Sequence, residues 1–485
     1  MLSQEQERSI QGVGVAGFRK DHQHLLFVVF RDAASGQQLL AALKNRIASY
    51  LEVAAFNRAY SEILQRSGRE DAIEATWVGL LIGPHGYEKL GVNLASEMTT
   101  GSGSEAFAAG MAARAEKIGH TRTGDVPSGW IPAFQPQNRI DACVVVASDD
   151  RDDLNQTVTD LTDVIASSNC ELAWAEPSAV LPGKLKGHEH FGFKDGISQP
   201  TIAEVEPPPA PNEPPAVPIG EFVLGYPDEK GEVQVGSLWR DGSFVAFERI
   251  VQHVIAFRQQ AAKAVEGTNP ALPTPQMEAK MVGRWPSGTP VETAPEGDPG
   301  ETGMTNAFQY KAEPFNDDEG GKTPRFAHIR KANPRDETTP DPTDPVARHR
   351  MIRRGVPFGP PLPEGATTDD GIARGLHFLC FVADLARQFE FVQREWLSNP
   401  NFPNGGKPAQ EGGQYQPPAE GTPPDGPDPV VGEHDPGAQC ALHQASGART
   451  FDLGEEVVNV TAGEYFFAPS ISALEHLASG ATKSE

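Results

Sequence analysis

Short runs of hydrophobic residues alternate with segments of helical spacing along the first third of the chain. Three apolar runs, at residues 23–30, 77–83 and 140–148, are rich in branched and aromatic side chains and predict three strands. Apolar residues spaced three or four positions apart predict amphipathic helices at about residues 36–56 and 153–168. This succession of strand, helix and strand indicates a mixed α+β fold.

The same succession returns in the second half, after a proline-rich spacer at residues 206–218 (EPPPAPNEPPAVP). So many prolines exclude a helix or a central strand in the spacer. The recurrence suggests a duplicated ferredoxin-like α+β unit, with one half at residues 1–218 and the other at residues 219–485. The elements predicted after the spacer are strands at residues 243–247, 376–383 and 465–468, helices at 248–265 and 385–397, and a proline- and glycine-rich loop at 399–438.

Composition and charge narrow the classes of partner. Hydrophobic residues make up 38% of the chain and charged residues 22%, which is typical of a soluble globular protein. The formal net charge of −25, from 41 basic and 66 acidic residues, argues against a nucleic acid or an anionic membrane as partner. The charge is compatible with an enzyme that acts on neutral or cationic small molecules.

The cysteines and the N-terminus bear on the cellular compartment. The four cysteines are widely spaced and form no CxxC pair, so we expect free thiols and a reducing compartment. The sequence MLSQEQERSIQG has neither a basic region nor an apolar core of the kind found in secretory signals, and no apolar run is long enough to span a membrane. We therefore expect a cytoplasmic protein.

A carboxylate stands between two glycines in residues 191–200 (FGFKDGISQP). Gly192 and Gly196 permit tight turns and the close approach of a flat ligand, so Asp195 would be presented to a ligand and not packed in the core. The alternative is an ordinary Asp-Gly turn between two elements.

Among the histidines, His328 has a distinctive neighbourhood in residues 326–335 (FAHIRKANPR). A haem iron needs one neutral imidazole, and the basic residues that follow could neutralise haem propionates. The alternative is a basic surface segment. His188 and His190 form an HxH pair that could bind a metal, although no third ligand of suitable spacing accompanies them.

Three segments, GFKDG at residues 192–196, HIRKANPR at 328–335 and RRGVPFGP at 353–360, occur in an order that resembles the haem-site signature of the dye-decolorising peroxidases. The resemblance extends over almost the whole chain through three further fragments. These are IQG at residues 10–12, DGSFVAF at 241–247 and GEYFFAP at 463–469. The resemblance implies two ferredoxin-like halves, each an antiparallel sheet with peripheral helices, and one haem b per chain held chiefly by the second half.

The resemblance also assigns roles to residues. It makes His328 the proximal iron ligand, and it places Asp195 over the distal face of the haem with Arg353 beside it. Asp428 would be the carboxylate that orients the ring of His328. Trp396 is the candidate for surface electron transfer from large donors, the alternative being a half-buried packing tryptophan. The remaining residues expected at the cofactor are Gly192, Ile197, Arg330, Leu376 and Phe378.

These roles imply a peroxidase that uses hydrogen peroxide to oxidise dyes, phenols and similar donors through a ferryl intermediate. Asp195 would take a proton from the inner peroxide oxygen and return it to the outer one, while Arg353 would keep Asp195 ionised at low pH. Activity is therefore expected to be best in acid. The alternative is a haem-binding or haem-iron-releasing protein of the same fold, and either would be a monomer or a homo-oligomer. The absence of a GxSxG motif speaks against a hydrolase.

Overall fold

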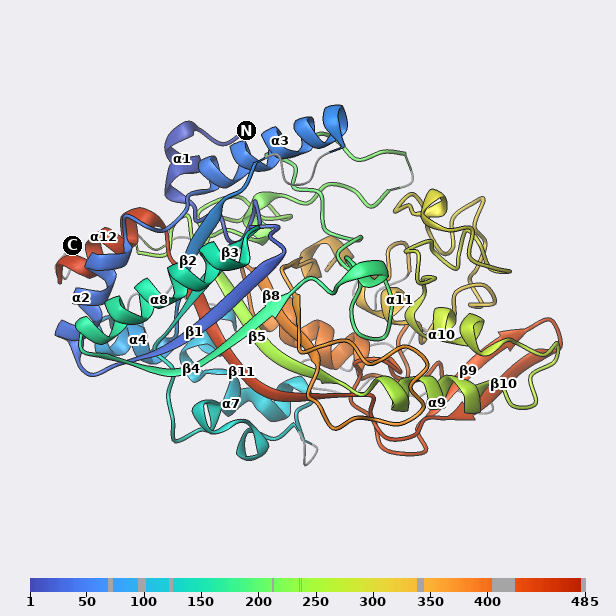
Figure 1. The fold of residues 1–485 in the computed structure, drawn as a ribbon. Coiled ribbons are helices and arrows are strands. Elements are labelled where there is room, and N and C mark those ends of the chain that lie inside the picture. The colour runs from blue at the N-terminus through green and yellow to red at the C-terminus, as the bar shows by residue number, and fades with distance from the viewer. Residues whose placement is uncertain are drawn as a thin grey trace.

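Antiparallel strands from both halves of the chain form one nine-stranded sheet in the computed structural model (Figure 1). The structure describes residues 1–485 except 69–72, 95–101, 122–124, 212, 235, 237, 338–343, 404–423 and 481–485. The sheet order is β4-β1-β3-β2-β11-β5-β8-β6, and β7 also pairs with β8. Its strands are β1 (His22–Phe30), β2 (Thr76–Ile82), β3 (Ala142–Ser148), β4 (Cys170–Ala179), β5 (Ser243–Gln252), β6 (Ile352–Arg353), β7 (Val356–Phe358), β8 (Gly375–Val382) and β11 (Val458–Ala468).

The two halves of the chain supply separate ends of this sheet. Strands β1 to β4 lie together at one end, and β5 to β8 with β11 lie at the other, so the halves meet where Ile82 of β2 pairs with Phe467 of β11. A separate hairpin of β9 (Gln439–Gln444) and β10 (Gly447–Asp452) follows outside the sheet. This order is compatible with two ferredoxin-like halves, and the boundary between residues 218 and 219 stays a proposal.

Helices cover the two ends differently. Figure 1 shows α2, α4, α8 and α12 beside the strands of the first half, close to both chain termini, whereas α9 to α11 and the β9–β10 hairpin lie beyond β5 and β8. The helices are α1 (Gln4–Ser9), α2 (Ala33–Leu43), α3 (Tyr50–Ser67), α4 (Pro84–Lys89), α6 (Ser102–Ala109), α7 (Met111–Arg114), α8 (Arg151–Ser167), α9 (Val254–Ala264), α10 (Thr274–Val282), α11 (His328–Ala332) and α12 (Ile471–Ser479). Two π-helical segments, η8 (Ala386–Glu390) and η9 (Val392–Leu397), follow β8. The 3₁₀ turns are η1 (Ala115–Ile118), η2 (Pro127–Gly129), η3 (Pro132–Phe134), η4 (Gly183–Leu185), η5 (Ile219–Glu221), η6 (Glu301–Gly303) and η7 (Val346–His349).

Three hydrophobic clusters hold these elements together. The largest runs through the sheet, where all seven residues of β3 are buried, as expected for a strand covered on both faces. A second cluster joins α9 and α10 to Phe326, two residues before α11. A third, smaller cluster surrounds Trp396 in η9. The second cluster therefore fixes the segment just before His328, and the third cluster fixes η9.

Capping explains why the helix expected at residues 36–56 is two helices. Ser49 starts α3 with a capping box, in which its Oγ accepts from the backbone N–H of Glu52 and the Glu52 carboxylate accepts from the backbone N–H of Ser49. Between the helices, Ile47 forms a bridge with Val78 of β2. The apolar spacing continued across this break, so spacing alone could not reveal it.

Strand pairing explains the other differences. The helix expected at residues 248–265 begins only with α9, because residues 248–252 continue β5 and pair with β11. Strand β4 was not expected. It contains Pro177, which lacks an N–H for a sheet ladder, and it lies at the edge of the sheet, where such a residue is tolerated.

The structure also bears on the cysteines, on membrane crossing and on the loop expected at residues 399–438. All four cysteines are free, as predicted. Within the described residues, no helix is long and apolar enough to cross a membrane. Most of the loop expected at residues 399–438 lies outside the described residues.

Candidate active site

A cavity of about 240 Å³ lies against one face of β5 and β8. Glu248, Ile250 and Gln252 of β5 and Leu376 and Phe378 of β8 line it, because alternate residues of a strand point to the same face. The other walls come from parts of the segments 189–198, 282–284, 328–335, 349–355, 389–397 and 430–431, and from Val458. The lining is mainly apolar, with a few polar groups, as in sites for small molecules and cofactors.

His328, the first residue of α11, faces this cavity with a third of its side chain exposed. Its Nδ1–H donates to Asp428 Oδ2 at 2.7 Å. The other oxygen of the buried Asp428 accepts from the backbone N–H of Val430 at 2.7 Å. Burial acts to lower the pKa of His328, but the charge of Asp428 and its hydrogen bond together outweigh burial and raise that pKa. This bond fixes the ring and leaves Nε2 as the free nitrogen for a ligand.

A tight loop presents Asp195 to the same cavity. The Glu189 carboxylate accepts from the backbone N–H groups of Phe191 at 2.8 Å and Phe193 at 2.9 Å, and Gly192 has a φ of 99°. Asp195 itself is exposed in the cavity, and its Oδ1 accepts from the N–H of Gly196 at 2.6 Å. Burial, together with the nearby charge of Asp195, raises the pKa of Glu189 to about 7.

A glutamine ties this loop to the strand that carries Arg353. Gln199 Oε1 accepts from the backbone N–H of Arg353 at 3.0 Å, and Gln199 Nε2 donates to its carbonyl at 3.0 Å. The Arg353 guanidinium also donates to the Ser198 carbonyl at 3.3 Å. Arg353 and Asp195 therefore line one cavity from two chain segments, without an ion pair between them.

A second and larger cavity, of about 620 Å³, lies on the other side of these two residues. Both cavities are lined by Glu189, Asp195, Gly196, Arg353 and Gly355. The larger cavity extends from these shared residues to the exposed Arg19. Small molecules in the larger cavity would therefore have access to Asp195 and Arg353.

Three more arginines, Arg284, Arg335 and Arg350, line the first cavity. They donate to carbonyl, amide or hydroxyl oxygens, and none of them forms an ion pair with a carboxylate in the described part of the chain. Burial, with the repulsion of neighbouring arginines, lowers the pKa of Arg284 to about 10 and that of Arg350 to about 9. A group of unpaired buried cations is a binding site for an anionic ligand.

Comparison with known proteins identifies the chain. Residues 9–176 match the family model described as the DyP dimeric alpha+beta barrel domain. A dye-decolorizing peroxidase of Mycena epipterygia is 30% identical over 97% of this chain and 86% of its own length. A second dye-decolorizing peroxidase, of Auricularia auricula-judae, is 31% identical over 79% of this chain and 72% of its own length. The chain belongs to the dye-decolorizing peroxidase family.

Solved structures of the family agree with this assignment. An ancestral D-type dye-decolorizing peroxidase superposes with a TM-score of 0.81, at 30% identity over 97% of this chain and 98% of the other. The decolorizing peroxidase of Auricularia auricula-judae superposes with a TM-score of 0.77, at 26% identity over 97% and 99% of the two chains. The α+β fold expected from the sequence is confirmed, and the protein is a haem-dependent peroxidase.

The cavity fits a haem in three respects. A fixed imidazole with a free Nε2 is the expected donor for haem iron. The apolar residues of β5 and β8 suit a flat macrocycle, and the unpaired arginines suit two propionates. In addition, both amide atoms of Asn333 are buried without a partner among the described residues, and Asn333 lines the cavity.

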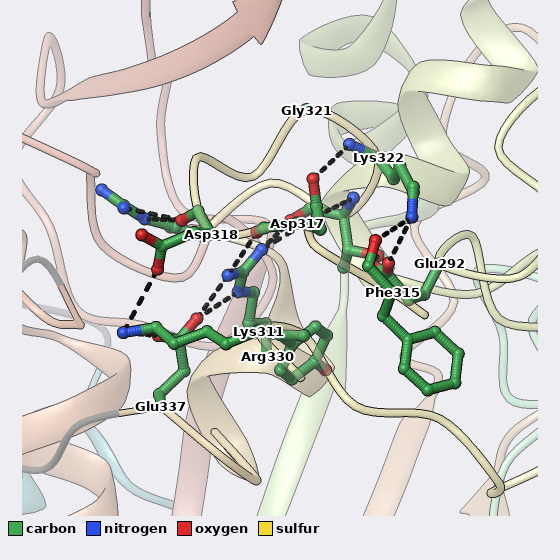
Figure 2. Close-up of polar contacts among 12 residues, drawn as sticks. Glu292, Lys311, Phe315, Asp317, Asp318, Gly321, Lys322, Arg330 and Glu337 are labelled. Atoms are coloured by element: carbon green, nitrogen blue, oxygen red, sulfur yellow. Dashed lines mark hydrogen bonds and ion pairs between the residues drawn. The ribbon is translucent and has the colours of Figure 1, made fainter. Parts of the chain in front are cut away.

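The structure corrects the prediction for Arg330, which does not line the cavity. Figure 2 shows the Arg330 guanidinium between Glu337 and Asp317. Its Nε donates to Glu337 at 2.8 Å, its Nη1 donates to Asp317 at 3.1 Å, and the side chain is fully buried. These carboxylates draw Arg330 away from the cavity, so its expected contact with the cofactor is wrong.

Two further expectations are corrected. Gly192 shapes the turn before Asp195 but does not line the cavity. Trp396 is only 1% exposed, so it is not a surface residue. Its ring is covered by the stacked ring of Phe402, with centroids 5.3 Å apart, and it also contacts His349, which lines the cavity.

The HxH pair does not form a metal site in the structure. His188 bonds to the carbonyls of Lys186 and Pro286, and His190 Nε2 bonds to the carbonyl of Phe358 at 2.9 Å. Among the described residues, no group of three or more His, Cys, Asp or Glu side chains is placed to hold a metal ion.

Most of the expected site residues do come together. His328, Asp195, Arg353, Ile197, Leu376 and Phe378 line the cavity, and Asp428 bonds to His328. Five residues that line the cavity were not predicted from the sequence: Glu189, Arg284, Asn333, Arg335 and Arg350. Asn333 and Arg335 lie within the HIRKANPR segment, so that segment held a signal for two of them. Arg284 lies in no segment that drew attention.

Proposed function

We propose that this enzyme uses hydrogen peroxide to oxidise dyes, phenols and similar one-electron donors, with Asp195 as the distal acid–base and Arg353 assisting. One observation carries the proposal. His328, fixed by Asp428, shares a single cavity with Asp195 and Arg353, and a second cavity leads to the last two. When bound, haem supplies the iron that activates peroxide and holds the oxidising equivalents.

The residues that would hold the haem follow from the cavity lining. His328 Nε2 would bind the iron, and the Asp428 carboxylate would make the imidazole a stronger electron donor. Arg284, Arg335 and Arg350 would pair with the propionates. No cysteine lines the cavity, which supports a haem b held without thioether bonds, one per chain.

Asp195 would move one proton between the two oxygens of peroxide. Its carboxylate takes the proton from the inner oxygen and returns it to the outer oxygen, which leaves as water. The Arg353 guanidinium stabilises the negative charge that develops on the departing oxygen. Peroxide would arrive through the larger cavity, because these two side chains line both cavities.

Large dyes would give up electrons without entering the cavity. Trp396 stays the candidate for carrying them, now as a buried relay, since it contacts both Phe402 and the cavity residue His349. Small phenols could approach Asp195 more directly through the larger cavity. The physiological donor is not specified by these contacts.

The test compares Asp195→Asn and Arg353→Leu with the wild-type protein after haem reconstitution. We expect all three to show the same Soret absorption of bound haem, while the spectral change on adding one equivalent of peroxide is slowed at least 100-fold in Asp195→Asn. Full activity of both variants would refute the two roles. A wild-type Soret band that peroxide leaves unchanged would instead favour a haem-binding or haem-iron-releasing protein.

His328→Ala tests the haem site independently of turnover. Haem titrated into the haem-free variant should bind more weakly and give a spectrum without imidazole ligation. A wild-type spectrum in this variant would remove His328 as the ligand.

A further inference from the structure

A buried carboxylate interrupts the apolar wall of the haem cavity at Glu248 on β5. Its side chain is 1% exposed, and Glu248 Oε1 lies 2.8 Å from Nε2 of the buried His120. Its neighbours in the wall include Ile250, Val430 and Val458. A charged pair in such surroundings is not explained by packing, since hydrophobic residues of similar volume are often as stabilising.

A third, small cavity lies beside this pair. It has a volume of about 40 Å³, enough for water, and both Glu248 and His120 line it. The side chains around it are otherwise rich in ionisable groups: Asp125, Glu433, His434 and Glu456. Glu433 and Glu456 are only half-buried, so this cavity connects the pair with groups near solvent.

We infer that Glu248 and His120 form a proton relay between the protein surface and the haem cavity. Glu248 joins the two cavities, because among the described residues that line both of them it is the one with an ionisable side chain, and His120 lines the small cavity. In the relay, His120 Nε2–H gives its proton to Glu248 Oε1, and Glu248 passes a proton to water in the haem cavity. His120 regains a proton through the small cavity. This inference rests on the proposed reduction of peroxide.

The chemistry of that reduction requires such a supply. Each peroxide takes two electrons and two protons to give two waters, so one O–O bond breaks and two O–H bonds form. Asp195 only moves a proton from one peroxide oxygen to the other. When electrons arrive from a donor outside the cavity, both added protons have to come from solvent.

The charges around the relay favour its protonated form. Burial acts to lower the pKa of His120, but the carboxylates of Glu248, Asp125 and Glu433 outweigh burial and raise that pKa. The charged groups facing His120 come from β5, from the segment before η2 and from residues 433–456, and all except His434 are acidic. His120 therefore can hold the proton that it passes on.

The test uses a donor that brings no proton. Two ferrocyanide ions reduce one peroxide only if two protons are taken from solvent, whereas hydroquinone supplies its own. For His120→Phe and Glu248→Gln, we expect turnover with ferrocyanide to fall at least tenfold and its solvent isotope effect to rise. Turnover with hydroquinone should fall much less, and the first spectral change with peroxide should keep its wild-type rate.

His377→Gln is the matched control. The buried His377 Nε2 lies 2.5 Å from the carboxylate of the half-buried Glu176, and this His–Glu pair of the same sheet does not line the haem cavity. In this variant, turnover with ferrocyanide and turnover with hydroquinone should change by the same factor. Glu248→Gln keeps the shape of the side chain, so it serves where His120→Phe does not fold.

Several outcomes decide the inference. An unchanged ferrocyanide rate in haem-loaded Glu248→Gln would overturn it, and so would an equal loss with both donors, which indicates a structural role. If the variants lost the first spectral change with peroxide, the result would indicate a defect in the proton transfer assigned to Asp195. It would then bear on the proposed function and contradict a separate relay. In the haem-free protein, nitrogen NMR of His120 should show a proton on Nε2 whose signal shifts in Glu248→Gln, and an unshifted signal would also contradict the relay.

Discussion

Two buried arginines with opposite surroundings allow a direct test of how the structure assigns their roles. Arg330 lies within a network of carboxylates, whereas Arg350 lines the haem cavity without one. We expect Arg330→Met to destabilise the haem-free fold. We expect Arg350→Met to weaken haem binding and to leave the haem-free fold as stable as before or more so.

The magnitudes follow from the partners of each side chain. The Arg330 guanidinium bonds Glu337, Asp317 and the Thr323 carbonyl, the last at 2.7 Å, and its side chain is 0% exposed. Removing one partner of a buried ion pair costs about 3–5 kcal/mol, so we expect a loss of this size in the free energy of unfolding. Among the described residues, the Arg350 side chain donates only to the Ser198 carbonyl, at 3.4 Å, and neighbouring arginines repel it. Losing one charge-assisted contact to a propionate should weaken haem binding about 10- to 100-fold.

The assay measures both quantities for both variants. Urea unfolding of the haem-free proteins gives the change in stability, and titration with haemin followed at the Soret band gives the dissociation constant. The reasoning would be refuted if Arg330→Met kept wild-type stability and lost haem affinity while Arg350→Met lost only stability. That reversed pattern would support the contact between Arg330 and haem expected from the sequence.

Three other variants test Asp428, the buried Glu292 that bonds Lys322 and Thr323, and Gly355. Asp428→Asn should weaken haem binding about 10- to 100-fold, because it removes the carboxylate that orients His328, and an unchanged haemin titration would contradict this. Burial raises the pKa of Glu292 to about 7, so its stabilising contribution is complete below about pH 4.5 and is lost as the pH rises through about 7. Glu292→Gln should abolish that loss and gain about 1–3 kcal/mol over the wild type between about pH 5 and pH 8, whereas a constant difference in urea unfolding would contradict the shift. Gly355→Ala would place a methyl group 3.1 Å from Leu376 Cδ2, where the two cavities meet, and should slow the reaction with peroxide in stopped-flow measurements; an unchanged rate would remove Gly355 from the entry path.

The fold was predictable where local sequence determines local structure. The cores of β1, β2, β3 and β8 follow from short apolar runs that have to be buried. The errors occurred where a partner distant in sequence decides the structure. Residues 248–252 are a strand because they pair with β11, and their own spacing is equally compatible with a helix.

The site residues were predicted correctly, or missed, for the same reason. His328 and Asp195 were found because each lies in a short, distinctive segment. Within HIRKANPR, however, nothing local shows that Arg335 lines the cavity while Arg330 turns to Glu337 and Asp317. The burial of Trp396 likewise depends on Phe402, which folds back over the ring from the loop after η9.

The absence of carboxylate partners for the described cavity arginines is informative, because the chain is rich in acidic residues. It carries 66 acidic residues against 41 basic ones, and Arg330, close in sequence to the cavity arginines, finds two carboxylates. Four arginines of the cavity nevertheless lack a carboxylate partner among the described residues. Their mutual repulsion is offset only when an anion binds, so haem uptake should stabilise this fold more than the iron–imidazole bond alone would. The same arginines that oppose folding of the haem-free chain thereby select a ligand with negative charge at its edge.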